Sequence, residues 1–194
     1  MYLTVWPWEH LAVGYLLYSA FVHLTDNRSP ETAPALVLAF GTQFPDLIDK
    51  TLAWTLSVVA SGVSVAHSVF TAVCLSASVV VLSQRLGHRR LGVAFAVGYL
   101  AHIPADMLYP VLLGGRLHLE AYLWPLVTVT APARGGFFAN FTYYAAQFIT
   151  FLGTGRGAVF LILEVVLLGT AVVVWLLDGR PVLEILPGFN SEIT

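Results

Sequence analysis

Charged side chains are scarce in this chain of 194 residues. Only 10 % of the residues are Asp, Glu, Lys or Arg, against about 25 % in an ordinary soluble domain. Nine basic and eleven acidic residues give a formal net charge of −2, so no basic face for nucleic acid is evident. By contrast, 58 % of the residues are hydrophobic and the mean hydropathy is +0.80. This composition excludes a disordered chain and a typical water-soluble globule, and it predicts an integral membrane protein.

Lysine and cysteine each occur once, as Lys50 and Cys74. A single cysteine cannot form an intrachain disulfide, so cysteine usage does not indicate the redox compartment. The first ten residues contain no Lys or Arg, which argues against a cleavable signal peptide with a basic start. The length suits one compact domain. We therefore expect a single transmembrane domain over residues 1–180 and a short polar tail over residues 181–194.

The few charged residues divide the chain into about six apolar stretches. A helix needs about 20 apolar residues to cross the hydrocarbon layer, and unpaired backbone groups cannot face lipid, which favours helices. We therefore predict an all-α, polytopic membrane protein with about six hydrophobic helices, among which short re-entrant or interfacial segments can occur. The predicted helices occupy residues 10–25, 32–45, 65–83, 91–113, 137–152 and 158–177, with an interfacial segment or turn before residue 65.

The densest positive charge lies in one short loop, which contains Arg85, Arg89 and Arg90. An excess of basic residues is typical of cytoplasmic loops, so this loop predicts the orientation of the chain in the plasma membrane. Counting helices backward places the loop with Arg28 on the same side. A set of polar residues then falls together on the outer side, although none of them was used to set the orientation. These residues are His10, Asp46, His67 and Asp106.

His102 and Asp106 form the most specific polar pair within an apolar stretch. A spacing of four places both side chains on one face of a helix, and Pro104 between them can kink that helix. Imidazole nitrogen and carboxylate oxygen are the usual ligands of zinc or manganese. Ionisable groups at membrane depth are candidates for function. The alternative is a buried His–Asp hydrogen bond that only ties helices together.

A second polar group surrounds Pro45, which suits the first turn of a helix. Asp46 and Asp49 are three residues apart and share a face if this segment is helical. Asp49 could instead form an ion pair with Lys50 at the membrane edge, and Lys50 is open to a structural or a phosphate-binding role. His67 stands in an uncharged run, where a lone histidine is usually a core residue. The predicted topology nevertheless places it beside Asp46.

For the other polar residues, the surrounding sequence does not decide between a functional and a structural role. His10 is either a ligand or an interfacial residue, because Trp6 and Trp8 beside it fit an aromatic belt. Further candidates without an assigned role are His118, Glu120 and Glu164.

In their order along the chain, these elements resemble the family of membrane-bound metal-dependent hydrolases. The resemblance covers residues 8–125, and the segment around residues 46–54 is similar to its haloarchaeal branch. Its motifs are His10, GTQFPDLIDK at residues 41–50, AHS at residues 66–68 and GYLAHIPAD at residues 98–106. The order of residue types is also distantly similar to that of zinc-dependent phospholipase C and P1 nuclease.

The resemblance implies a metal-dependent hydrolase with one or two divalent ions, zinc being the first choice. The implied metal ligands are His10, Asp46, His67, His102 and Asp106, and the implied catalytic carboxylates are Asp46 and Asp49. The implied reaction is hydrolysis of a phosphoester or ester by metal-activated water. A lipid-like substrate could enter sideways from the bilayer.

Val63 departs from the family pattern, because members often carry an arginine at this position. Without that arginine, a bidentate clamp on a phosphate is missing. Two alternatives to an enzyme therefore stay open. One is a non-enzymatic membrane protein, either a transporter or a metal-binding assembly subunit. The other is a purely structural polar cluster.

Overall fold

The computed structural model describes residues 5–112, 115–131 and 135–185. Every regular element in these residues is helical, so the predicted all-α class is confirmed there. The elements are α1 (Pro7–Asp26), α2 (Thr32–Lys50), the π-helix η1 (Thr51–Thr55), α3 (Val69–Arg85), α4 (Arg89–Leu112), the 3-10 helix η2 (Leu119–Tyr122), α5 (Phe137–Leu152), α6 (Gly155–Leu177) and the 3-10 helix η3 (Leu183–Ile185).

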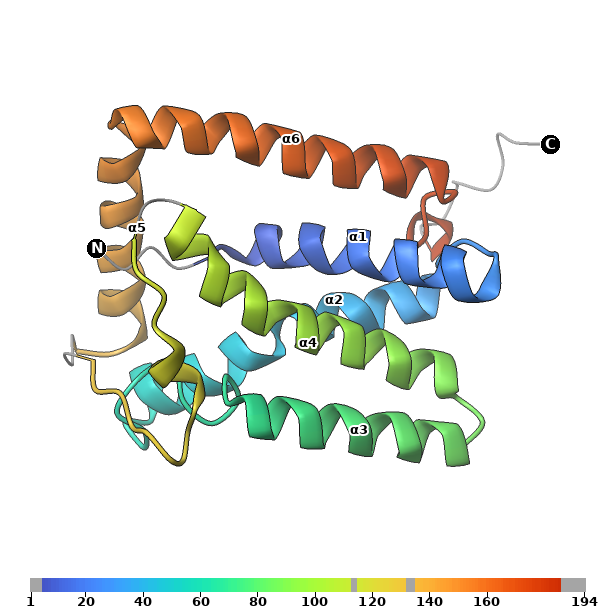
Figure 1. Cartoon of the computed structure of the whole chain (residues 1–194), viewed down its shortest axis with the longest axis horizontal. Helices are drawn as coiled ribbons and strands as arrows, with labels where there is room; N and C mark the ends of the chain where they lie inside the picture. Colours follow the sequence, from blue (N-terminus) through green and yellow to red (C-terminus); the bar gives the residue numbers. More distant parts are fainter. Residues whose placement is uncertain (1–4, 113–114, 132–134, 186–194) are drawn as a thin grey trace.

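Helix α4 is the centre of the bundle, since it contacts α1, α2 and α3. Helices α1, α3, α4 and α6 run along the long axis of the molecule (Figure 1). Helix α6 lies at the margin and packs against α1. Helix α5 differs from the others, because it lies crosswise at the end of the molecule where α1 begins (Figure 1).

Among the described residues, two of the six α-helices are long and apolar enough to cross a membrane. These spans are Arg89–Val111 in α4 and Gly155–Leu177 in α6, with 23 residues each. Helix α5 has 16 residues and therefore extends about 24 Å at 1.5 Å per residue, which is less than the roughly 30 Å of a hydrocarbon core. The crosswise direction of α5 is that expected of a helix lying at the membrane interface, one of the kinds of segment that the sequence analysis allows. Length and hydropathy thus support two of the about six predicted hydrophobic helices as membrane crossings, and for the others a crossing stays a prediction.

Two helix boundaries differ from those expected. Helix α2 continues to Lys50, so Pro45 lies inside the helix and not in a first turn. Helix α3 begins at Val69 and not at residue 65, because the preceding segment is held by polar contacts to Asp49. His67 therefore lies in the connection before α3.

The backbones of α2 and α4 approach each other closely at two glycines. A Cβ atom on Gly98 would lie 2.6 Å from the carbonyl oxygen of Leu38, and one on Gly41 would lie 2.7 Å from that of Phe95. Small residues allow such close contact between helices in membranes. This contact brings the C-terminal half of α2 against the middle of α4, where the polar residues of both helices meet.

The opposite end of the bundle is closed by Asp178, which is buried. Its Oδ2 accepts hydrogen bonds from the hydroxyls of Tyr15 at 2.8 Å and Ser19 at 2.7 Å, and its Oδ1 lies 2.7 Å from His23 Nε2. These contacts tie the end of α6 to α1. They explain Asp178 as a structural residue.

The predicted tail over residues 181–194 is described only as far as residue 185. In this part the backbone N–H of Val182 donates to Thr32 Oγ1 at 3.2 Å, so the tail starts against the beginning of α2. Its remaining residues, and the end of the fourth predicted helix at residue 113, lie outside the described residues. The boundary between domain and tail stays a prediction.

Candidate metal centre

Three segments bring imidazoles and carboxylates together at the end of the bundle opposite the arginine-rich loop. Helix α2 supplies Asp46, the connection before α3 supplies His67, and α4 supplies His102 and Asp106. One potential ligand atom from each residue lies within 4.8 Å of those of the others. Both imidazoles are fully buried, whereas the two carboxylate side chains are 12 % and 13 % exposed. The structure shows that this group could hold a metal ion.

The separations between the donor atoms match a metal polyhedron. His67 Nε2 lies 3.2 Å from His102 Nε2, and Asp106 Oδ2 lies 3.3 Å from each of these nitrogens. Asp46 Oδ1 lies 3.5 Å from His67 Nε2. Zinc with bonds of about 2.0–2.1 Å and tetrahedral angles has ligand atoms roughly 3.3 Å apart. The separations among His67, His102 and Asp106 are close to this value, and all four ligand atoms lie within 4.8 Å of one another.

Hydrogen bonds on the far side of each ring decide which nitrogens face the cluster as lone pairs. His102 Nδ1 lies 2.7 Å from the carbonyl oxygen of Thr42, which can only accept, so Nδ1 carries the hydrogen. His67 Nδ1 lies 2.8 Å from Asp49 Oδ2 and carries its hydrogen for the same reason. In the neutral rings, two Nε2 lone pairs then face each other at 3.2 Å. A proton on one of the two nitrogens or a metal ion between them would relieve this opposition, and the orientation of both rings is that of metal-binding histidines in proteins.

His10 lies directly beside the cluster. Its ring stacks on that of His102 with centroids 3.7 Å apart, and its Nε2 lies 3.4 Å from Asp106 Oδ1. The side chain is buried, and neither ring nitrogen has a hydrogen-bond partner among the described residues. A buried polar atom without a partner is costly. His10 is thus placed where it could add a further nitrogen ligand.

Asp49 lies behind His67 and is fully buried. Its Oδ2 accepts from the backbone N–H groups of Ser64 at 2.7 Å and His67 at 3.0 Å, and its Oδ1 accepts from that of Ala66 at 3.0 Å. Together with the contact to His67 Nδ1, these bonds engage both carboxylate oxygens. The geometry therefore favours a positioning role for Asp49 over that of a general base.

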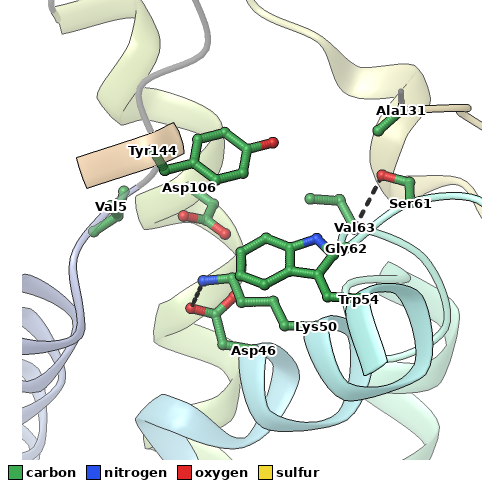
Figure 2. A pocket seen from close by; sticks show the side chains of 10 residues that line it. All are labelled: Val5, Asp46, Lys50, Trp54, Ser61, Gly62, Val63, Asp106, Ala131 and Tyr144. Atoms are coloured by element: carbon green, nitrogen blue, oxygen red, sulfur yellow. Dashed lines mark hydrogen bonds and ion pairs between the residues drawn. The ribbon is translucent and has the colours of Figure 1, made fainter. Parts of the chain in front are cut away.

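A cavity of about 60 Å³ opens onto Asp46 and Asp106. Lys50, Trp54 and Tyr144 also line it (Figure 2). The Lys50 ammonium donates to Asp46 Oδ2 at 2.5 Å, so Lys50 pairs with Asp46 and the alternative of an ion pair with Asp49 is not observed. The further lining residues include Ser61, Gly62 and Val63. At the position where the resemblance expects an arginine, the structure thus has an apolar wall with Lys50 beside it.

Trp54 and Tyr144 are site residues that the sequence analysis does not find. Their rings stack with centroids 5.6 Å apart and an interplanar angle of 19°. Trp54 belongs to η1 and Tyr144 to α5, so ninety residues of chain separate them. No spacing rule connects residues that far apart, and aromatic residues are common in membrane segments.

The comparison with known protein families identifies the chain. The sequence model of the YdjM inner membrane protein family matches residues 6–181, which is most of its length. The chain belongs to the YdjM inner membrane protein family. Membership agrees with the predicted plasma-membrane location. No curated protein and no solved structure matches the chain significantly.

Three candidate residues of this YdjM-family protein lie outside the cluster of potential ligands. His118 and Glu120 are close to each other, with Nδ1 and Oε1 3.0 Å apart. The hydrogen bond from His118 lowers the pKa of the exposed Glu120 carboxyl. Glu164 accepts a hydrogen bond from Trp8 Nε1 at 2.6 Å. These contacts give all three residues partners other than the four members of the cluster.

Proposed function

We propose that this YdjM-family protein is a metal-dependent hydrolase that acts on a phosphoester or ester of a lipid-like molecule. The observation that carries the proposal is the pair of opposed Nε2 atoms of His67 and His102, with two carboxylates at bonding distance from the same point. Hydrogen bonds from both rings to oxygen acceptors fix this arrangement. A structural cluster would need a proton between these two nitrogens, so the metal content of the purified protein separates the two interpretations.

In this proposal the metal is zinc, as one or two ions. The residues that would hold it are Asp46, His67, His102 and Asp106, with His10 as a further ligand. A bound zinc ion lowers the pKa of a coordinated water and polarises the oxygen of the group to be cleaved. Asp49 orients His67 through the bond to Nδ1. This division of roles follows from which side-chain atoms are already engaged.

Lys50 is the residue suited to bind the substrate in this proposal. Its ammonium lies at the cavity beside Asp46, about where a substrate oxyanion would approach the cluster. Lysine binds phosphate as a point charge. The Trp54 ring lies 5.6 Å from the ammonium and holds it toward the cavity. Lys50 thereby compensates in part for the absence of a guanidinium at Val63.

The proposal predicts hydrolysis that depends on metal. Purified protein in liposomes is assayed with a panel of lipid and nucleotide phosphoesters and carboxylic esters. We expect turnover that a chelator abolishes and added Zn²⁺ restores, because the water must be activated by the ion. The variant Asp46→Ala should be inactive, whereas the exposed His88→Ala at the other end of the molecule should keep full activity.

Two outcomes would contradict this prediction. Activity that survives complete removal of metal would exclude the metal-dependent mechanism. A zinc-loaded protein without turnover on any ester would favour a non-enzymatic metal-binding function.

The orientation in the membrane is a second part of the proposal, in which the site faces the outside. The arginine-rich loop precedes α4, whereas His102 and Asp106 lie in its C-terminal half, so a cytoplasmic loop places the cluster toward the outer side. In a Cys74→Ala background, His88→Cys should be protected from an impermeant thiol reagent in intact cells. Gly115→Cys, which follows α4, should react. The reverse labelling pattern would place the site in the cytoplasm.

A further inference from the structure

An apolar groove lies between α1, α4 and α6, and its lining includes none of the four residues of the metal cluster. Its volume is about 470 Å³, which is in the range of small-molecule sites. The apolar lining includes Val13, Leu17, Leu108, Leu163 and Leu167. Several of these side chains are more than half exposed, for example Leu17 at 51 % and Leu108 at 55 %. The groove therefore accepts a hydrocarbon chain from the surrounding bilayer.

One end of the groove carries an unexpected acidic group, Glu9, which is 2 % exposed. Its Oε2 accepts from the backbone N–H of Trp6 at 2.5 Å and so caps the start of α1. Its Oε1 is buried and has no hydrogen-bond partner in the described part of the chain. Capping thus engages one carboxylate oxygen of Glu9, while the carboxyl group also lies close enough to Tyr109 and Glu164 to interact with them.

Two more oxygen-bearing side chains line the same groove. Glu164 comes from α6 and accepts from Trp8 Nε1 through its Oε1. The buried hydroxyl of Tyr109 on α4 has no hydrogen-bond partner among the described residues. The residues found to line the groove include no Lys, Arg or His. Two carboxyl groups in an apolar site without a basic partner would be stabilised as carboxylates by a cationic ligand that donates hydrogen bonds.

We propose that this groove binds a long-chain primary amine, with the hydrocarbon chain along α1, α4 and α6. The ammonium head lies at the end formed by Glu9, Glu164 and Tyr109. A primary ammonium has three N–H donors, and the groove offers three oxygen-bearing groups from three helices. An anionic lipid head would be repelled by the two carboxyl groups. A neutral alcohol would bring one donor and no charge. This proposal does not depend on the proposed hydrolase activity.

The test compares three ligands that share a twelve-carbon chain, bound to the protein in phosphatidylcholine nanodiscs, with empty nanodiscs as the background. Dodecylamine has both charge and donors, dodecyltrimethylammonium has the charge without donors, and dodecanol has a donor without the charge. We expect dodecylamine to bind at least about tenfold more tightly than either of the others, because charged hydrogen bonds contribute strongly in an apolar site. Equal binding of all three ligands would overturn the proposal. This comparison uses the unaltered protein, so it does not depend on the folding of a variant.

Variants then locate the site. Glu9→Gln removes the charge but keeps an oxygen that can cap α1. Glu164→Gln likewise removes the charge and keeps an oxygen that can accept from Trp8 Nε1. Each should weaken dodecylamine binding by about tenfold or more, while Glu120→Gln, an exposed acid away from the groove, should leave it unchanged. Unchanged binding in the Glu9→Gln, Glu164→Gln double variant would refute the assignment.

Discussion

Replacing His102 with alanine is expected to reduce bound divalent metal from about one ion per chain to under a tenth of that. His102 Nε2 lies within 3.3 Å of both His67 Nε2 and Asp106 Oδ2, so its loss opens the cluster on the side of α4. Insertion into the membrane should persist, because it depends on the apolar helices and not on this residue. The measurement is elemental analysis of purified protein after dialysis against a weak metal buffer.

His88→Ala is the matched control for this prediction. His88 is exposed and lies between α3 and α4, at the end of α4 away from the cluster, so metal content should equal that of the unaltered protein. His67→Ala should behave as His102→Ala does. Full metal content in both His67→Ala and His102→Ala would leave only a structural role for the polar cluster.

Much of the fold follows from where the sequence places its few charges. Each of the six predicted apolar stretches corresponds to one α-helix, because a helix pairs the backbone groups of a long apolar segment within that segment. The start of α3 could not be predicted. It depends on hydrogen bonds from the backbone of residues 64–67 to Asp49, and these contacts join segments that composition does not relate. The crosswise direction of α5 likewise depends on packing at the bundle end (Figure 1).

The candidate site was predictable only where side-chain chemistry and spacing carry information. His102 and Asp106 are one turn apart on one helix, and counting the predicted helices leads us to expect Asp46 and His67 on the same side of the membrane. The contact from His102 to the Thr42 carbonyl was not predictable, because every residue has such an oxygen. It results from the close approach of α2 and α4.

The two kinds of polar group at this end of the molecule have different electrostatic requirements. The cluster of Asp46, His67, His102 and Asp106 directs lone pairs and carboxylates toward one point and suits a small, strongly charged cation. The groove at Glu9 has an apolar lining and suits a large, weakly charged one. Glu9 and His10 are adjacent in α1, and the His10 ring stacks on that of His102. A ligand bound at Glu9 would therefore lie next to a residue that contacts the cluster.

Asp49→Asn is expected to lower the affinity for Zn²⁺ by about 10- to 100-fold, because a partner that orients a metal-binding histidine is lost. Asp49 is acceptor-only when ionised and accepts from three backbone N–H groups and from His67 Nδ1. An asparagine has one oxygen and an NH₂ group that donates, so at least one of these donors would face another donor. Competition with a chromophoric chelator measures the change in affinity.

Two measurements distinguish a positioning role of Asp49 from that of a general base. They are the absorption spectrum of the Co²⁺-loaded protein and the rate of ester hydrolysis. If Asp49 only positions His67, the Asp49→Asn protein saturated with Co²⁺ should keep the spectrum of the unaltered protein, because the coordinating atoms are the same. His67→Ala should change that spectrum, because a ligand is lost. At saturating metal, Asp49→Asn should also retain most of its turnover. Normal affinity combined with abolished turnover would instead make Asp49 the general base, with its hydrogen bonds to residues 64–67 broken during the reaction.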